Sequence, residues 1–388
     1  MFELSSEKLT DLGAEITTRE IKQQPELWQE AFEYYKEEEN RIKDFLDQIK
    51  AKHPHTRVIF TGAGSSAYVG DTVVPYLKEV GDEKSFEFQA VPTTSIVSNP
   101  KSYFKKDFPT ILVSFARSGN SPESVASVQH GQNLVDDFYQ ITITCAPEGK
   151  LAEKAQGDEK NLLLLMPARS NDQGFAMTGS FTCMTLSAIL VFDPKTVDEK
   201  AGYVSQMRAM AEDLMKREQE LQDLIDQDFN RVIYLGSGPQ AGISREVQLK
   251  ILELTAGKVA TAFDSSLGFR HGPKSFIDDK SIAFLYVSND PYTRQYDVDM
   301  LKELNADKIA KIVYGISVEQ DNNFDGSNFT FDKSYADLPD AYLALPYTMF
   351  GQIISLMTAI KVGNKPDTPS PTGTVNRVVK GVTIHENL

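Results

Sequence analysis

A short strand pattern that ends in glycines occurs twice in this chain and limits the folds that the chain can adopt. Val58–Gly64 reads VIFTGAG, and Val232–Gly238 reads VIYLGSG. A second apolar run follows each copy in the same order, at Thr110–Phe115 and at Ser281–Ser288. Short apolar strands that alternate with helical segments are typical of a parallel sheet covered on both faces. The repetition therefore predicts two tandem α/β folds.

The segments around these copies predict how the chain is divided. Gln24–Lys50 carries apolar residues at helical spacing among many charges, which predicts an amphipathic helix before the first strand. Lys200–Asp228 is a long charged helical stretch between the two copies. We expect an N-terminal helical segment at residues 1–50, a first domain at 51–199 and a second domain at 200–388. A length of 388 residues agrees with two domains, because one hydrophobic core seldom serves so long a chain.

The charge balance excludes several classes of partner. The chain has 40 Lys and Arg against 55 Asp and Glu, a net charge of −15. Such a field repels nucleic acid and anionic lipid surfaces, so we expect neither a nucleic acid nor a membrane as partner. The N-terminus lacks a signal-peptide pattern, and no window reaches the roughly 18 unbroken apolar residues of a membrane span. These patterns predict a cytoplasmic protein.

The two cysteines, Cys145 and Cys183, lie in apolar stretches. Two thiols cannot form a disulfide framework or a four-thiolate zinc site, and we expect both to be buried spectators. No His, Asp or Glu cluster has the spacing of metal ligands. We therefore expect no metal and no other cofactor.

Ser114–Ser124, which reads SFARSGNSPES, suggests an anion site built locally in an acidic protein. It follows a predicted strand, and Pro122 suits the first turn of the next helix. Ser118 and Ser121 supply hydroxyls, Gly119 lets the main chain approach a ligand, and Arg117 offers a cation. Several converging donors suit a phosphate monoester. An ordinary turn with a helix cap explains the same residues equally well, because Ser and Asn are preferred there.

Gly62–Ala67 allows a different interpretation, a dinucleotide site. Its glycines permit a tight turn and a close approach to a pyrophosphate, and the helix behind them favours negative charge. The acid that would bind a ribose is Glu87. This pattern alone is a weak indication.

Two further residues are candidates for acid–base chemistry. His271, one of five histidines, stands between Arg270 and a Gly-Pro pair just after a predicted strand at Val259–Asp264. Glu253 lies near the end of a predicted helix and is flanked by leucines, an environment that can raise the pKa of a carboxylate and make it a base. The alternatives are an exposed or structural histidine, and a solvated glutamate paired with Lys250.

Together these motifs resemble the sugar isomerase (SIS) domain family. The resemblance rests on the two glycine-ended strands, the SFARSGNSPES loop, the LKILELTAGK helix and the LGFRHGPKS loop, and it covers nearly the whole chain after about residue 50. Within the family, the chain is most similar to the group of tagatose-6-phosphate ketose/aldose isomerases and galactosamine-6-phosphate deaminase/isomerases. The resemblance implies two flavodoxin-like parallel sheets in tandem.

The isomerase half of glucosamine-6-phosphate synthase, a member of that family, implies a role for several residues. Glu253 resembles the base of that relative. His271 resembles its ring-opening histidine, which in the relative comes from the neighbouring subunit. Lys380 resembles a lysine of its C-terminal tail. Ser66 resembles a serine after the first glycine turn of the relative. The phosphate-binding loop matches in part, because Ala116 replaces a serine. The implied phosphate ligands are Ser66, Arg117, Ser118, Gly119, Asn120 and Ser121, and the implied sugar ligands are Gly64, Ser65, Thr178, Ser180 and Arg270.

The resemblance implies an aldose–ketose isomerase that acts on a hexose 6-phosphate. The expected reaction converts galactosamine 6-phosphate to tagatose 6-phosphate with release of ammonia, in a homodimer or higher homo-oligomer with shared active sites. Two alternatives remain open: an isomerase without deamination, and a non-catalytic sugar-phosphate sensor. Retention of both Glu253 and His271 favours an enzyme.

Overall fold

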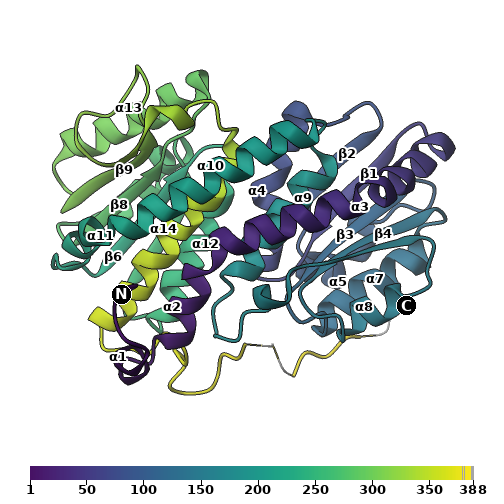
Figure 1. The fold of residues 1–388 in the computed structure, drawn as a ribbon, viewed down its shortest axis with the longest axis horizontal. Helices are drawn as coiled ribbons and strands as arrows, with labels where there is room; N and C mark the ends of the chain where they lie inside the picture. The colour runs from purple at the N-terminus through teal and green to yellow at the C-terminus, as the bar shows by residue number, and fades with distance from the viewer. Residues whose placement is uncertain (378, 380, 386–388) are drawn as a thin grey trace. The chain divides into compact units, whose positions relative to one another are not determined.

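The computed structural model describes residues 1–377, 379 and 381–385, which form two compact α/β units (Figure 1). The unit called here the A unit comprises Glu26–Asp172, Gly179–Lys200 and the chain from Val375 onward. The B unit comprises Met1–Pro25, Gln173–Thr178 and Ala201–Thr374. The domain boundaries predicted at residues 50 and 200 stay a prediction. The compact units divide the chain differently, because Met1–Pro25 and Gln173–Thr178 belong to the B unit and the chain from Val375 onward belongs to the A unit.

The A unit contains a five-stranded parallel sheet in the order β2-β1-β3-β4-β5. The strands β1, β3 and β4 are buried along almost their whole length, as expected for parallel strands covered on both faces. Its strands are β1 Thr56–Thr61, β2 Phe86–Ala90, β3 Thr110–Ala116, β4 Phe138–Thr144 and β5 Asn161–Leu165. This strand order is that of a flavodoxin-like fold.

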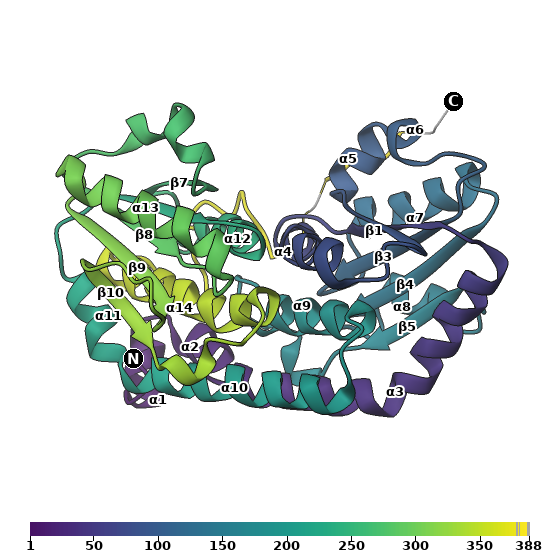
Figure 2. The same ribbon diagram turned by 90° about the horizontal axis from the view of Figure 1, so that it is seen from above.

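Helices cover both faces of this sheet (Figure 2). On one face α5–α8 bury Ile59, Leu112 and Val128 in one apolar cluster. On the other face α4 packs against α9, and Phe60 and Phe192 stack edge to face. The helices are α3 Gln24–Lys52, α4 Ser65–Val80, α5 Thr93–Ser98, α6 Pro100–Tyr103, α7 Pro122–Leu134, α8 Lys150–Ala155, η1 Ala168–Ser170 and α9 Gly179–Phe192.

The B unit repeats the arrangement with a parallel sheet in the order β10-β9-β8-β6-β7, which is the same topology read from the other edge. Its strands are β6 Arg231–Gly236, β7 Ala260–Ser265, β8 Ser281–Tyr286, β9 Ile312–Val318 and β10 Ser327–Phe331. Its helices are α1 Ser6–Asp11, α2 Glu15–Lys22, α10 Val197–Lys216 (which begins in the A unit), α11 Glu218–Ile225, α12 Pro239–Leu254, η2 Gly268–His271, η3 Pro273–Phe276, α13 Pro291–Asp307, η4 Lys333–Tyr335 and α14 Asp340–Lys361. In Figure 2, α13 lies on one face of the sheet and α14 on the other.

Helix α14 is the core helix of the B unit. Among the described residues it is the one helix long and apolar enough to cross a membrane by length and composition, and 94% of its apolar window is buried inside the protein. It packs against α12, and its aromatic rings pack on sheet residues, as Phe350 does edge to face on Phe284. Its apolar character therefore serves the core.

The glycine turns of the two units have the same geometry. Gly64 has φ 58° and ψ −132°, and Gly238 has φ 56° and ψ −128°, in each case immediately before a helix. Two residues earlier, a Cβ on Gly62 would lie 2.5 Å from Ser66, and one on Gly236 would lie 2.7 Å from Gln240. Only glycine fits where the helix turns back this closely. The prediction of two tandem flavodoxin-like folds is confirmed.

Candidate active site

The predicted phosphate loop follows β3 at the carboxyl edge of the A-unit sheet. Gly119 has φ 67°, which only glycine adopts readily, and Ser121 caps α7 by accepting from the Ser124 main-chain N–H at 3.2 Å. The amide oxygen of Asn120 accepts from Lys150 N at 3.1 Å and so braces the loop. Ser118 is partly exposed and lies in the same loop, shortly before the first turn of α7. Such a helix start is suited to an anion.

The first glycine turn supplies the neighbouring candidates at the same sheet edge. Ser65 and Ser66 are the first two residues of α4, and both are buried. Gly64 is the N-cap of this helix and has no side chain that could cap it. Because β1 and β3 are adjacent in the sheet, the turn after β1 and the loop after β3 lie at neighbouring strand ends. The structure thus brings the predicted phosphate ligands to one edge.

Arg117 contacts the C-terminal segment. Its buried guanidinium donates from Nη2 to the main-chain oxygen of Arg377 at 2.7 Å. Arg377 in turn donates to Asn171 Oδ1 at 3.2 Å and to the main-chain oxygen of Asp172. The chain at Arg377 is therefore tied to the phosphate loop within the A unit. Lys380 lies outside the described residues, so its predicted role stays a prediction.

The second predicted group of sugar ligands surrounds the start of α9. The Ser180 hydroxyl and main-chain N–H both donate to Asp172 Oδ2, at 2.5 and 2.9 Å, and Gly179 N donates to Asp172 Oδ1. Asp172, which is fully buried, therefore caps this helix. Thr178 and Ser180 are both buried, and the Ser180 hydroxyl is already used inside the protein.

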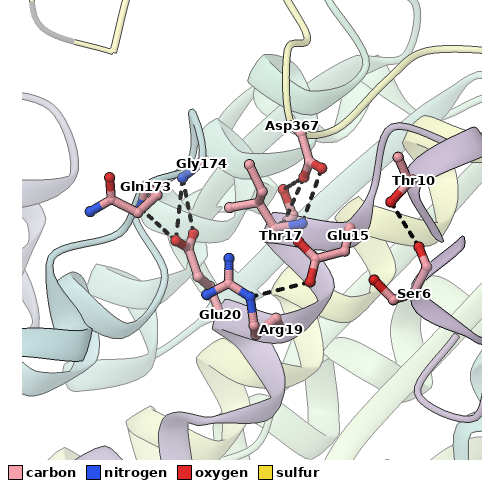
Figure 3. A network of polar contacts seen from close by, with 10 residues as sticks. Ser6, Thr10, Glu15, Thr17, Arg19, Glu20, Gln173, Gly174 and Asp367 are labelled. Atoms are coloured by element: carbon pink, nitrogen blue, oxygen red, sulfur yellow. Dashed lines mark hydrogen bonds and ion pairs between the residues drawn. The ribbon is translucent and has the colours of Figure 1, made fainter.

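The segment before this helix is held by a glutamate from α2 (Figure 3). Glu20, 2% exposed, accepts main-chain hydrogen bonds from Gln173 and from Gly174, where the distances are 3.2 and 3.3 Å. On the same helix, the Thr17 hydroxyl and N–H donate to Asp367 at 2.7 and 2.8 Å. Figure 3 shows the carboxylate of Glu20 accepting from the main chain at Gln173 and Gly174, and the carboxylate of Asp367 accepting from Thr17.

Glu253 lies in the last turn of α12, and its side chain is 22% exposed. Lys250 Nζ donates to Glu253 Oε2 at 2.7 Å and lies 3.5 Å from Glu246 Oε1. The ion pair between Glu253 and Lys250 is the one that the alternative interpretation predicts, but Lys250 and Glu246 are buried and so do not lie on a solvated face. An ammonium group that serves two carboxylates fixes Glu253 in one orientation at the surface.

His271 is exposed at the end of η2, and Arg270 beside it is paired with Glu303 at 2.7 Å. Lys274 pairs with the same glutamate at 2.6 Å, and these hydrogen bonds hold the pKa of Glu303 below its usual value. Phe269 anchors the turn in the B-unit core. The histidine is thus carried on a turn that Phe269 and the Arg270–Glu303 pair hold in place.

The candidates divide between the two units. Those predicted to bind the phosphate belong to the A unit, whereas Glu253, Arg270 and His271 belong to the B unit. Asp172 and Arg377 carry no signal in the sequence, because their partners are recognised only once distant segments have folded together. The sequence also does not indicate that Lys250 is buried next to Glu246.

The dinucleotide interpretation fits the geometry poorly. Glu87 is the second residue of β2, near the amino end of that strand, whereas ligands of such sheets bind at the carboxyl ends. Its carboxylate lies 3.9 Å from Arg57 and accepts from Gln89. Glu87 is therefore badly placed to bind a ribose.

The buried cysteines have the character of spectators. Both thiols are buried, and burial raises the pKa of Cys145 to about 12 and that of Cys183 well above its usual value. A thiol that stays protonated is a poor nucleophile and a poor metal ligand. Within the described ranges, no three His, Cys, Asp or Glu side chains are grouped as metal ligands would be.

Known proteins resemble this chain along its whole length. The model of the SIS domain matches residues 52–192. The D-galactosamine-6-phosphate deaminase AgaS of Shewanella sp. (strain ANA-3) is 41% identical over 383 residues, which are 98% of this chain and 95% of that relative. The chain belongs to the AgaS family of SIS-domain proteins. The family resemblance seen in the sequence is therefore confirmed.

Solved structures agree with membership in the AgaS family. A crystal structure from Clostridium novyi NT is 42% identical, covers 100% of this chain and 99% of that one, and superposes with a TM-score of 0.92. The tagatose-6-phosphate ketose/aldose isomerase of Escherichia coli is 38% identical, with 95% and 96% coverage and a TM-score of 0.86. The likeness extends over both sheets of the AgaS-family fold.

Proposed function

We propose that this protein is a cytoplasmic enzyme that converts galactosamine 6-phosphate and water to tagatose 6-phosphate and ammonia. The observation that carries the proposal is the 41% identity, over 98% of the chain, to a D-galactosamine-6-phosphate deaminase. The loop at the start of α7 supports a phosphorylated substrate, because it offers hydroxyls and a helix N-terminus in a protein of net charge −15.

Glu253 is the proposed base. It takes the proton from C2 of the open-chain amino sugar and returns it to C1, so that the enolamine becomes an imine at C2. Water adds to that carbon, and ammonia leaves to give the ketose. The ion pair with Lys250 supports this role, because it holds the carboxylate in one orientation. No step of this route calls for a metal.

His271 is the proposed ring-opening group, contributed by a neighbouring copy of the chain. Its exposure suits a group that acts outside its own unit, and the rigid η2 turn suits a catalytic position. The edge strand β7 and the loop after it expose Phe263 and Leu267, 41% and 40% accessible, which a second copy would cover. We therefore propose a homodimer at least.

A mixing experiment tests this arrangement. The variants Glu253→Gln and His271→Asn should each lose most of the activity, but a mixture that exchanges subunits should recover part of it, since one hybrid site keeps both groups. A monomer by light scattering would contradict the shared site. So would proven subunit exchange with no recovery.

A second function, isomerisation of tagatose 6-phosphate without deamination, is favoured by one observation. The Escherichia coli protein that is 38% identical carries the name tagatose-6-phosphate ketose/aldose isomerase. The two functions differ in whether nitrogen leaves the substrate.

One coupled assay separates these functions. The purified protein is given galactosamine 6-phosphate, glucosamine 6-phosphate or tagatose 6-phosphate, and ammonia and sugar products are measured together. We expect ammonia and ketose in equal amounts from galactosamine 6-phosphate, and much less from its gluco epimer. Interconversion of tagatose 6-phosphate with an aldose, without any ammonia from the amino sugars, would establish the second function. Binding without turnover of any substrate would indicate a sensor.

A further inference from the structure

The B unit has an equivalent of the phosphate loop. Ser118 of the phosphate loop is partly exposed, whereas Ser288 of the equivalent loop is buried. The loop after β8 ends in an N-cap residue followed by proline, Asp290 and Pro291, as the loop after β3 ends in Ser121 and Pro122. At this place a buried carboxylate, that of Asp297, occupies the carboxyl edge of the B-unit sheet.

Three donors from three adjacent strand ends converge on this carboxylate. Ser237 after β6 and Ser266 after β7 donate their hydroxyl protons to Asp297 Oδ1 at 2.6 and 2.5 Å. Ser288 after β8 donates its main-chain N–H to Asp297 Oδ2 at 3.0 Å. In doubly wound folds this edge is where anionic ligands are bound. The side chain of Asp297 thus has the contacts that a small bound anion would have.

The reach of Asp297 follows from helix geometry. It is the seventh residue of α13, and helical side chains lean toward the N-terminus of their helix, here toward the loop that precedes it. Asp340 and Arg294 also bind the loop after β8. The Ser288 hydroxyl donates to Asp340 Oδ2, Asn289 N donates to Asp340 Oδ1, and Arg294 Nη1 donates to the main-chain oxygen of Ser288.

Asp297 and Ser266 are both fully buried, so the cradle is closed to a free ligand. Burial raises the pKa of Asp297, while the donated hydrogen bonds from Ser237, Ser266 and Ser288 oppose that change. The donors therefore favour the carboxylate anion over the neutral acid.

We propose that Ser237, Ser266 and Ser288 form an anion-binding site of the second sheet, and that the carboxylate of Asp297 is its permanent ligand. The duplicated fold then has one anion site open to substrate and one filled by its own chain. This inference concerns the B unit and does not depend on the proposed reaction. Removal of the carboxylate should leave a cradle that takes up a free carboxylate of the same size.

Chemical rescue tests the proposal in the full-length protein. Asp297→Ala keeps Cβ and removes the part of the side chain that formate can replace. We expect this variant to melt below the wild type and to be stabilised by sodium formate beyond an equal concentration of sodium chloride. A tenfold excess of formate over its dissociation constant should raise Tm by roughly 3–6 °C, in a saturable manner.

Two variants serve as controls. Asp299→Ala removes an exposed carboxylate from the same helix, and its Tm should respond equally to formate and chloride. Asp297→Asn keeps the cradle filled but cannot accept from all three donors, so it should be destabilised and insensitive to formate. If Asp297→Ala is insoluble, its refolding yield from urea is compared in the two salts, and a higher yield in formate is expected.

Two results would overturn the proposal. One is a destabilised Asp297→Ala variant that gains no more from formate than from chloride, in Tm or in refolding yield. The other is an equal formate response in Asp299→Ala or the wild type, which would show a general salt effect.

Discussion

Arg117 in the phosphate loop donates a hydrogen bond of 2.7 Å from Nη2 to the main-chain oxygen of Arg377, 260 residues later in the chain. The arginine that the sequence offered as a cation for phosphate therefore also anchors the C-terminal segment. The side chain of Arg377 adds a second anchor, because it donates to Asn171 Oδ1 and to the main-chain oxygen of Asp172 in the same unit.

Arg117→Met should release this segment without unfolding the protein. The buried guanidinium donates to a main-chain oxygen, and its loss removes a hydrogen bond to a charged group. We expect limited trypsin digestion after Arg377 to become several-fold faster, as followed by mass spectrometry. Arg169→Met, which breaks exposed ion pairs with Glu26 and Glu30, should leave this cleavage unchanged. A raised KM with unaltered cleavage would mean that Arg117 serves the phosphate alone.

Ser118→Ala should raise KM for the sugar phosphate more than it lowers kcat, because phosphate binding is shared by ground and transition states. The expected loss is about 1–3 kcal/mol, the range for leaving a charged partner without its hydrogen bond. Steady-state kinetics measure both constants. The control is Ser102→Ala, an exposed serine of α6, which should behave as the wild type. An unchanged KM in Ser118→Ala would remove this hydroxyl from the site.

Glu20→Gln should destabilise the B unit, because the buried carboxylate accepts the main-chain N–H groups of Gln173 and Gly174 (Figure 3). The amide keeps the size of the side chain but loses the charge and half of the acceptor capacity, at a cost of about 1–3 kcal/mol in urea unfolding. Glu15→Gln on the same helix breaks only a surface pair with Arg19 and should cost a few tenths of a kcal/mol, roughly. Equal midpoints for the two variants would contradict the special position of Glu20.

Asp340 should make stability depend on pH between 5 and 7.5. Burial of its carboxyl raises its pKa from 3.8 to about 6. A raised folded-state pKa contributes stability that is present below the unfolded value and is lost as pH rises through the folded value. The wild type should therefore lose about 1 kcal/mol over this range relative to Asp340→Asn, as measured by thermal unfolding at several pH values. Parallel pH profiles of the two proteins, or the same change in the exposed-site control Asp337→Asn, would contradict this assignment.

The sequence predicted the strands and turns whose signals are local. The strand at Arg57–Thr61 is recognisable because a buried parallel strand is mostly apolar. The turn at Gly62–Gly64 is recognisable because only glycine fits so close to the helix that follows it. Strands β2, β9 and β10 are not among the predicted strands. The edge strands β2 and β10 are short and partly exposed, so their residues show no clear period. Strand β9 is buried, but Gly315 and Ser317 interrupt its apolar run. Contacts such as Glu20 with Gly174 or Asp297 with Ser237 depend on how distant segments pack, and residue spacing carries no signal for them.

Glu253 is proposed to move the substrate C2 proton, and deuterium exchange measures that step directly. Galactosamine 6-phosphate is incubated in D₂O with the wild type, with Glu253→Gln, and with Glu212→Gln as an exposed control on α10. Substrate and ketose are then examined by NMR for deuterium at C2 and C1.

We expect wild type and control to incorporate deuterium, and Glu253→Gln to slow both incorporation and kcat by about 10²–10⁴-fold with little change in KM or Tm. Near-normal exchange in Glu253→Gln would contradict the account and move the role of the base to His271.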